Sequence, residues 1–399
     1  MIAFIIAPFF IALLVFVIYR TTNHLHNYFG KWTEFFLVGF SILLFGGLLA
    51  IVIAFLLSTV SPLKRVFYRI GYYWLGIILY FFVGLFIAVV IRSIVWLFLK
   101  NKNYKVDLAR NITIIFVTLF TAIMSIYGAN NAHKLHVTNY EVTIDKECDV
   151  DDLNIVLLAD LHIGYNTGLK EIQDMVNKVN ECDPDLIVIA GDTFDNEYDA
   201  VEQPEKMIEI LSSMHSKYGT YITYGNHDIE EKILVGFTFN WNKNCAQADE
   251  RMNRFIECCG FRLLYDNYVL IEDSIYLYGR PDKGKINLGN DERVDANDIT
   301  KNMDKSLPII VIDHEPAQLK QLADSGVDLD LSGHTHNGQL WPGTISIKWL
   351  WDNAYGSKQI ENMTSIVTSG VGLFGPNMRT GCIAEICNIK VIFNNKGEL

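Results

Sequence analysis

The first 128 residues of the chain almost lack acidic side chains. They contain ten Lys and Arg residues but only two acids, Glu34 and Asp107. The remaining residues have the opposite shortage, with 23 basic against 43 acidic side chains and a net charge of −20. A surface this acidic cannot displace the counterions of a nucleic acid, so DNA and RNA are excluded as expected partners. The charge pattern divides the chain near residue 128.

Paired cysteines are also missing. The seven cysteines are odd in number, Cys258 and Cys259 are adjacent, and no Cys-x-x-Cys pair occurs. Neither a thiolate metal site nor a disulfide framework is therefore expected. We interpret the cysteines as buried, inert thiols, which by itself favours a reducing compartment.

Long apolar runs fill the first part of the chain. Four of them, each near the ~20 residues that cross a bilayer, cover residues 2–19, 35–57, 72–91 and 112–127. They lack the mid-depth acids and broken helix pairs of transport sites, and no small-residue cleavage site follows the first run. We expect a transmembrane anchor of about four helices at residues 1–128, a linker and leading strand at 129–149, and a soluble domain at 150–399.

Basic residues are distributed unequally between the loops of this predicted anchor. The two sets are Arg20, Lys31, Arg92, Lys100, Lys102, Lys105 and Arg110 on one side, and Lys64, Arg65, Arg69 and Lys134 on the other. The positive-inside rule puts the larger set in the cytoplasm. The chain is then a multi-pass membrane protein with an extracytoplasmic catalytic domain, against the weaker indication from the cysteines.

Five short apolar runs in the second part each end in polar residues. The runs cover residues 155–159, 186–190, 221–224, 309–313 and 327–331. Helical patterns at residues 170–179, 205–216 and 317–323 alternate with them, which predicts βαβ units. Because ligands bind outside the carboxyl ends of strands in such sheets, we expect the five polar ends to share one rim. Further short runs after residue 261, including 344–348, predict a second, more antiparallel sheet.

The polar ends supply a set of oxygen and imidazole donors. The candidate ligands are Asp160, His162, Asp192, Asn226, His314, His334 and His336. Such donors suit Mn, Fe or Zn better than Ca, and seven side chains with one bridging carboxylate suit two divalent metal ions, the arrangement used in phosphoryl transfer. Each residue alone has an ordinary explanation as a cap, turn or core residue. Five coincidences at one topological position argue against that explanation.

His227 and Asp228 directly follow the candidate ligand Asn226. His227 is placed to protonate a leaving oxygen, and Asp228 to orient its imidazole.

Arg379 stands in a Gly- and Pro-rich stretch and is open to two interpretations, a phosphate contact or a surface salt bridge. We interpret the aromatic residues that follow the third and fifth motifs as core residues, in preference to residues of a membrane interface. They are Phe237, Phe239, Trp241, Trp341, Trp349 and Trp351.

Asp-x-His, Gly-Asp-x-x-Asp, Gly-Asn-His-Asp, His and Gly-His-x-His occur in this order, and the series resembles the signature of the calcineurin-like metallophosphoesterases across residues 150–393. The resemblance implies a hydrolase of ester or diphosphate bonds with a four-layer αββα sandwich and a dinuclear site. It implies two metal groups and a bridge: Asp160, His162 and His336; Asn226, His314 and His334; and Asp192.

Residues 333–339 also resemble a membrane-anchored subgroup with the motif Gly-His-Thr-His-x-Gly-Gln, which includes UDP-diacylglucosamine pyrophosphatases. Asn337 stands where that subgroup commonly has glycine. We therefore expect a membrane-anchored phosphoesterase whose substrate is phosphorylated and membrane-associated or lipid-linked, with membrane lipids around it. The alternatives are a phosphodiesterase of phospholipid head groups or nucleotides, and a non-catalytic membrane sensor on the same fold.

Overall fold

The computed structural model describes residues 33–57, 62–99, 106–231, 233–234, 237–238, 249–283 and 293–394, with five single positions before them. The chain forms two compact units, Met1–Thr121 and Ala122–Leu399. The boundary lies within a helix and several residues before the charge boundary at 128, so the end of the last apolar helix belongs to the second unit.

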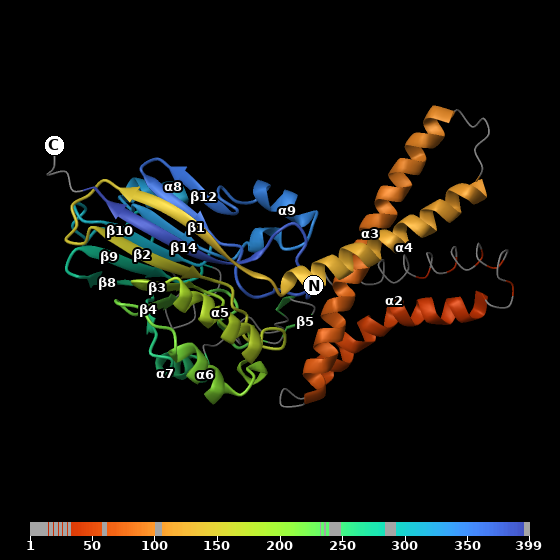
Figure 1. Ribbon diagram of the computed structural model, residues 1–399, viewed down its shortest axis with the longest axis horizontal. Coiled ribbons are helices and arrows are strands. Elements are labelled where there is room, and N and C mark those ends of the chain that lie inside the picture. Colours follow the sequence, from red (N-terminus) through yellow and green to blue (C-terminus); the bar gives the residue numbers. More distant parts are fainter. Residues whose placement is uncertain are drawn as a thin grey trace. The chain divides into compact units, whose positions relative to one another are not determined.

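The described part of the first unit is helical (Figure 1). It contains α2 (Thr33–Leu56), α3 (Pro62–Leu99) and most of α4 (Val106–Ala132). Helices α2 and α3 pack closely, because a Cβ atom on Gly47 would overlap the Trp74 ring and one on Gly71 would overlap Ile51. Small residues of this kind let apolar helices approach each other in a bilayer.

Two of the described helices are long and apolar enough to cross a membrane. They are Pro62–Phe98 and Leu108–Ala132, and they contain the predicted runs 72–91 and 112–127. The run 35–57 coincides with α2, but only Leu44–Leu56 qualifies there, as a shorter apolar helix. Apart from two single positions, residues 2–19 lie outside the described part. The described residues thus support two spans, not the four that we expected.

The second unit contains two six-stranded sheets and a short hairpin, β5 (Ile233–Leu234) with β6 (Phe237–Thr238). The first sheet has the order β1 (Leu135–Ile144), β14 (Ala384–Phe393), β2 (Asp152–Leu158), β3 (Leu186–Ala190), β4 (Thr220–Thr223) and β7 (Arg262–Leu263). The second has the order β12 (Gly356–Ile360), β13 (Met363–Val367), β11 (Leu329–Ser332), β10 (Ile309–Asp313), β9 (Ile275–Arg280) and β8 (Asn267–Ile271).

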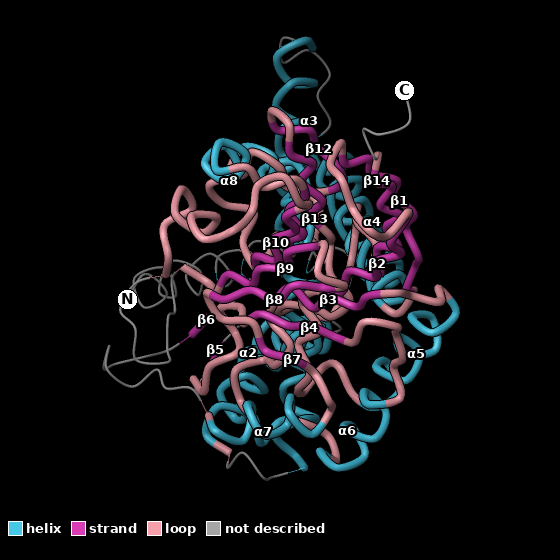
Figure 2. Tube along the Cα trace, turned by 90° about the vertical axis from the view of Figure 1, so that its left-hand side faces the viewer, coloured by secondary structure: helices cyan, strands magenta, loops and turns pink. Residues whose placement is uncertain are grey.

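Three apolar clusters hold these layers together. One, with Leu157, Val188 and Ile312, fills the space between the sheets. The second joins the outer face of the first sheet to α5 (Leu169–Glu181), α6 (Pro204–Ser212) and α7 (Glu250–Cys258), and the third joins the second sheet to α8 (Leu319–Ser325). Figure 2 shows the sheets between α6 and α7 on one side and α8 on the other. The predicted two-sheet α/β sandwich is confirmed.

The five strands of the predicted rim are shared between both sheets. Strands β2, β3 and β4 pair in the first, whereas β10 pairs with β9 and β11 in the second. The second sheet is also less antiparallel than expected, because β9, β10, β11 and β13 run parallel. The polar ends still converge, because the sheets pack face to face.

Residues 344–348 are helical and do not form the strand that we expected. They belong to α9 (Gly343–Ser346) and the 3₁₀ turn η4 (Ile347–Trp349). The amides of Gly343 and Ile345 donate to the carbonyls of Leu340 and Pro342, at 2.6 and 2.9 Å, as successive helical turns do. Alternation of Thr, Ile and Ser fits both structures over so short a run.

We expected a linker and a leading strand at residues 129–149, and the strand is present there as β1. Helix α4 continues to Ala132 and β1 begins at Leu135. Nδ2 of Asn131 donates to the carbonyls of Arg379 and Cys382, at 3.2 and 2.9 Å, and the Arg379 amide donates to the Gly128 carbonyl at 3.0 Å. The end of α4 is therefore built into the second unit.

Candidate metal centre

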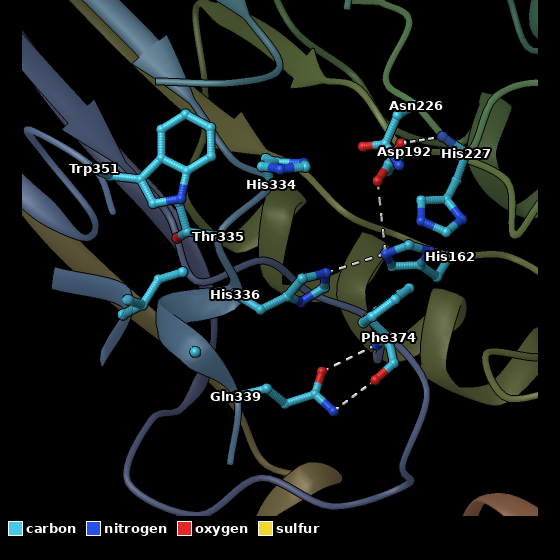
Figure 3. Close-up of a pocket in the computed structure, with 12 residues that line it drawn as sticks. His162, Asp192, Asn226, His227, His334, Thr335, His336, Gln339, Trp351 and Phe374 are labelled. Atoms are coloured by element: carbon cyan, nitrogen blue, oxygen red, sulfur yellow. Dashed lines mark hydrogen bonds and ion pairs between the residues drawn. The ribbon is translucent and has the colours of Figure 1, made fainter. Parts of the chain in front are cut away.

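The carboxyl ends of the strands deliver all the predicted ligands to one place. The ligands follow β2, β3 and β4 in the first sheet and β10 and β11 in the second. Figure 3 shows His162, Asp192, Asn226, His334 and His336 around a common space. This cavity of about 310 Å³ is lined by His162, Asp192, Asn226, His227, His334, Thr335, His336, Gly338, Gln339, Ile347, Trp351 and Phe374.

The first group consists of Asp160, His162 and His336, whose potential ligand atoms all lie within 4.8 Å of one another. The Nε2 atoms of His162 and His336 are 3.1 Å apart, and Nε2 of His336 is 3.7 Å from Oδ1 of Asp160. Metal–nitrogen bonds of ~2.1 Å at right angles separate two nitrogen ligands by ~3.0 Å. The two imidazoles are thus spaced as neighbouring ligands of one ion.

The second group consists of Asp192, His314 and His334, and Asn226 joins it. Nε2 of His314 lies 3.1 Å from Nδ1 of His334, 3.1 Å from Oδ1 of Asn226 and 3.2 Å from Oδ2 of Asp192. These separations also match adjacent ligands of one ion. The donor set, two imidazoles with amide and carboxylate oxygens, suits a divalent transition metal.

Asp192 faces both groups with one oxygen. Its Oδ2 atom is 3.2 Å from Nε2 of His314 in the second group and 3.9 Å from Nε2 of His162 in the first. Its Oδ1 atom accepts a hydrogen bond from the amide of His227 at 2.7 Å. The carboxylate is therefore fixed with Oδ2 between the two groups.

Oxygen atoms lie behind three of the imidazoles. Nδ1 of His314 donates to the carbonyl of Ala190 at 2.9 Å. Nε2 of His334 is 3.7 Å from Glu315, and Nδ1 of His162 is 3.6 Å from Asp195. A ligating histidine typically gives its second N–H to such an oxygen, which sets its tautomer and ring orientation. The opposite nitrogen of each ring then faces the centre.

The backbone at the site is strained. Five of the seven candidate ligands have a positive φ: Asp160, His162, Asp192, His334 and His336. Such conformations cost ~1–3 kcal/mol each and persist where the surroundings impose them. The amides of Asp160 and His162 donate to the carbonyls of Gly191 and Asp192, both at 3.0 Å.

Gly333, directly before His334, packs against a ligand. A Cβ atom at this position would lie 2.8 Å from Oδ2 of Asp160. The amide of His334 donates to both oxygens of the same carboxylate, at 3.1 and 3.0 Å. A larger residue at 333 would therefore displace Asp160 from the first group.

The protonation states of His334 and His336 suit a metal site, whereas His314 favours its protonated form. Burial and the nearby His314 lower the pKa of His334 to about 3, and burial and His162 hold the pKa of His336 well below its usual value. Both rings are therefore neutral, as ligands must be. Burial opposes the charged forms of Asp192 and His314. Their mutual attraction nevertheless lowers the pKa of Asp192 and raises that of His314 well above its usual value.

We predict that metal affinity rises with pH. Because the pKa of His314 is raised, a proton occupies its imidazole below that pKa and competes with a cation. Each displaced proton changes the apparent affinity about tenfold per pH unit, with weaker binding at lower pH. Titration of the metal-free full chain with Zn²⁺ between pH 5.5 and 8 measures the slope. Affinity independent of pH would contradict the assignment of His314 as a ligand.

His227 is held by residues other than the one that we expected. Its Nδ1 atom makes a short contact with Oδ1 of Asn196 and lies 3.9 Å from Asp195. The oxygens of Asp228 instead accept hydrogen bonds from the amides of Phe194 and Gly225, at 2.9 and 2.8 Å. Burial and the charge of Asp192 raise the pKa of Asp228 to about 7. Asp228 thus fixes the loops, and orienting the imidazole falls to Asn196 and Asp195.

Gln339, the last residue of the Gly-His-Thr-His-x-Gly-Gln motif, positions an aromatic wall. Its side chain accepts from the amide of Phe374 at 3.0 Å and donates to the carbonyls of Phe374 and Pro376, both at 2.9 Å. The Phe374 ring lies 5.3 Å from that of His227 and 6.2 Å from that of His336. Figure 3 shows this arrangement below the imidazoles.

Arg379 fulfils neither of its predicted roles. It is fully buried, and its guanidinium donates to the carbonyls of Ser369, Gly370, Gly372 and Ile383. The Gly372 amide in turn donates to the Asp160 carbonyl at 2.7 Å. Arg379 therefore supports the loop behind a ligand and contacts neither the pocket nor the surface.

The aromatic residues and cysteines are only partly as expected. Trp351 lines the pocket with its ring 5.4 Å from that of His334, and Trp349 is 81% exposed, so neither is a core residue. The side chains of residues 237, 239 and 241 lie outside the described part. Of the described cysteines four are buried, Cys182 is half-buried and Cys258 is exposed.

Three residues near the ligands were not identified from the sequence, and Asp195 was identified only as the end of the Gly-Asp-x-x-Asp motif, without a role. Asp195 and Asn196 closely follow Asp192, and Glu315 follows His314, so their positions within the motifs were an available signal. Phe374 offered none, because it reaches the site from a distant loop that Gln339 holds in place. A buried centre of carboxylates and imidazoles between two sheets is typical of α/β metal-binding proteins, and that is the class that the fold and site indicate.

Comparison with known proteins identifies a domain in the second part of the chain. Residues 153–338 match the family model described as calcineurin-like phosphoesterase. The chain thus contains a calcineurin-like phosphoesterase domain, as the order of its motifs predicted, and similar proteins are named metallophosphoesterases.

The similar proteins differ in length. A protein named transmembrane protein with metallophosphoesterase domain, from Danio rerio, is 29% identical over 69% of this chain and 62% of its own length. An uncharacterized metallophosphoesterase of Campylobacter jejuni is 28% identical over 75% and 73% of the two chains. One from Aquifex aeolicus is 27% identical over 65% and 94%. This chain thus spans under two thirds of the Danio rerio protein.

Proposed function

We propose that the protein is a membrane-anchored, metal-dependent phosphoesterase that hydrolyses a phosphate ester or diphosphate bond of a membrane-associated or lipid-linked substrate. The observation that supports this most is the position of Asp192, whose Oδ2 atom lies between two groups of imidazole and oxygen donors. A carboxylate shared by two such groups suits a pair of divalent ions, the usual centre for hydrolysis at phosphorus.

Two sets of side chains would bind the two metal ions. Asp160, His162 and His336 would hold one ion, and Asn226, His314 and His334 the other, with Asp192 shared. Two divalent cations, of Mn, Fe or Zn, supply Lewis acidity when bound.

His227 would supply the proton. The Nδ1 atom of His227 contacts Oδ1 of Asn196. The Nε2 atom is therefore the one that would donate a proton to a leaving oxygen. Phe374 lies against the His227 and His162 rings and restricts the approach of water on that side. The ring orientation that Asn196 and Phe374 impose is what makes His227 suitable as a general acid.

The membrane part of the proposal rests on the apolar helices Pro62–Phe98 and Leu108–Ala132 and on the name of the Danio rerio relative. The segments 20–31 and 92–110 carry more basic residues than the segments 64–69 and 134 on the other side of the predicted anchor. By the positive-inside rule this difference supports an extracytoplasmic catalytic domain. Reporter fusions to full-length chains test this orientation: a reporter at the carboxyl end that is active only in the cytoplasm would reverse it.

The activity is tested on the purified full chain loaded in turn with Mn²⁺, Fe²⁺ and Zn²⁺. The substrates are a nitrophenyl phosphate, its diester, a phospholipid and a lipid-linked diphosphate. We expect metal-dependent hydrolysis of at least one lipid substrate, with two ions per chain by elemental analysis. Two bound ions without turnover of any substrate would favour the non-catalytic sensor, and absence of bound metal would contradict the centre itself.

A further inference from the structure

Three large apolar side chains stand out on the second unit. Ile345, Trp349 and Leu350 are 48%, 81% and 74% exposed, the highest values for such side chains among the described residues after position 133. They lie within six residues of chain, in α9, in η4 and at the residue that follows. We name these three side chains the apolar lip. Exposed apolar side chains that cluster in this way mark an interaction surface.

The apolar lip adjoins the mouth of the metal pocket. Ile347 and Trp351, from the same segment, line the pocket, while their neighbours Trp349 and Leu350 are exposed. The segment is anchored behind the pocket, because the hydroxyl of Thr335 donates to the carbonyl of Ala354 at 2.7 Å. A surface that contacts the apolar lip would therefore lie next to the mouth of the metal pocket.

Contacts also lead from the apolar lip to the end of α4 inside the second unit. The amide of Trp341, just before the lip, donates to the carbonyl of Thr380 at 2.8 Å. Thr380 and Arg379 pack on Gly128 of α4, where a Cβ atom would lie 2.7 Å from the Thr380 side chain. The helix Leu108–Ala132 is long and apolar enough to cross a membrane. The lip thus lies on the side of the unit where this helix enters.

The local charge distinguishes the lip from the rest of the acidic second part. Residues 340–351 contain no acidic residue and one base, Lys348, which is exposed beside Trp349. Tryptophan and lysine are favoured at the interface of a bilayer, where the indole ring meets the head groups and the ammonium meets lipid phosphate. The composition of the lip therefore suits a lipid surface.

We propose that the apolar lip docks into the interfacial layer of the lipid bilayer and holds the mouth of the metal pocket at the level of the lipid phosphates. The inference rests on the proposed membrane anchor and deepens the proposed function, because it selects substrates whose phosphate lies at the membrane surface. A lipid phosphate would then enter the pocket past Trp351 while its acyl chains stay in the bilayer.

The location of Trp349 is tested directly, without an activity assay. The full chain is labelled with 5-fluorotryptophan and reconstituted in nanodiscs of neutral and anionic phospholipid, and Trp349→Phe assigns the Trp349 ¹⁹F resonance. We expect a nitroxide on the upper acyl chain of the lipid to broaden this resonance and a water-soluble gadolinium chelate to leave it sharp. Broadening by the chelate alone would place the lip in water. Protection from both reagents would mean that protein covers it, and either result overturns the proposal.

Activity gives an independent measurement. In the Trp349→Gln/Leu350→Gln variant we expect hydrolysis of a phospholipid in vesicles to fall at least about tenfold, because two apolar side chains no longer enter the interface. Hydrolysis of a soluble nitrophenyl ester should be unchanged. Leu270→Gln, at an exposed position of β8, is the matched control and should alter neither rate. Equal rates of vesicle hydrolysis in the lip variant and the wild type would overturn the proposal.

The two proposals can fail separately. A lipid-shielded Trp349 in a chain that hydrolyses no substrate would refute the proposed function and support docking. Hydrolysis of lipid phosphate by a chain whose Trp349 is exposed to water would refute docking and support the function.

Discussion

Asp192→Asn should lower metal occupancy in both groups and reduce hydrolysis at least about a thousandfold. The amide retains an oxygen for the His227 amide but puts an uncharged NH₂ group where Oδ2 faces His314 and His162. That change removes the negative charge shared by the two groups. Lewis acid stabilisation is worth several kcal/mol, and each ~1.4 kcal/mol corresponds to a tenfold change in rate.

Metal content per chain and single-turnover rates measure this effect. His336→Ala, which removes a ligand from the first group only, should lower occupancy mainly there. Asp174→Asn is the matched control, since this carboxylate pairs with Lys170 on the exposed face of α5. Two tightly bound ions in Asp192→Asn would exclude the shared position of this carboxylate.

His227→Ala should lose ~10²–10⁴-fold in the hydrolysis of alkyl or lipid phosphate esters and much less on a nitrophenyl ester. A strongly basic leaving oxygen needs a proton in the transition state, whereas nitrophenolate leaves without one. The backbone amide of His227, which bonds to Asp192, is retained in the variant, so both metals should remain bound.

Single-turnover rates are needed for this comparison, because slow product release would hide the difference. His215→Ala, at an exposed histidine after α6, is the control. Equal losses on both ester types would favour charge stabilisation by His227 over proton donation. Loss of metal would instead assign the residue to the metal site.

Much of the candidate site follows from the sequence, because each ligand is attached to the end of a buried strand. Hydrophobic runs with polar ends identify strands such as β3 and β10 at their observed bounds, Leu186–Ala190 and Ile309–Asp313. Once the strands are parallel and packed in a sandwich, their carboxyl ends must meet. The seven ligands thus converge even though the division of strands between the two sheets was not anticipated.

The rest depends on contacts between residues far apart in the chain. Carbonyls of the surrounding loop bind the guanidinium of Arg379. From its charge alone we predicted a phosphate contact or a surface salt bridge. We predicted that Asp228 orients the His227 imidazole, because the two residues are adjacent in sequence. The Asp228 carboxylate instead accepts hydrogen bonds from the amides of Phe194 and Gly225. Local spacing identifies which residues reach a site better than it identifies what they touch there.

The folded junction between α4 and β1 decides where the second unit can be separated from the apolar helices before it. Gly128 and Asn131 bond to the backbone of residues 379–382, which in turn contact the segment that leads to the pocket. A chain cut at Ala129 would lose Gly128 and the turns of α4 that position Asn131, and so weaken the support of that loop. A protease releasing an intact unit must cut before Ala122, within an apolar helix where, in a membrane-anchored chain, water is scarce. For a chain anchored in this way, shedding is a poor route of regulation, and a soluble fragment of the second unit needs the last turns of α4.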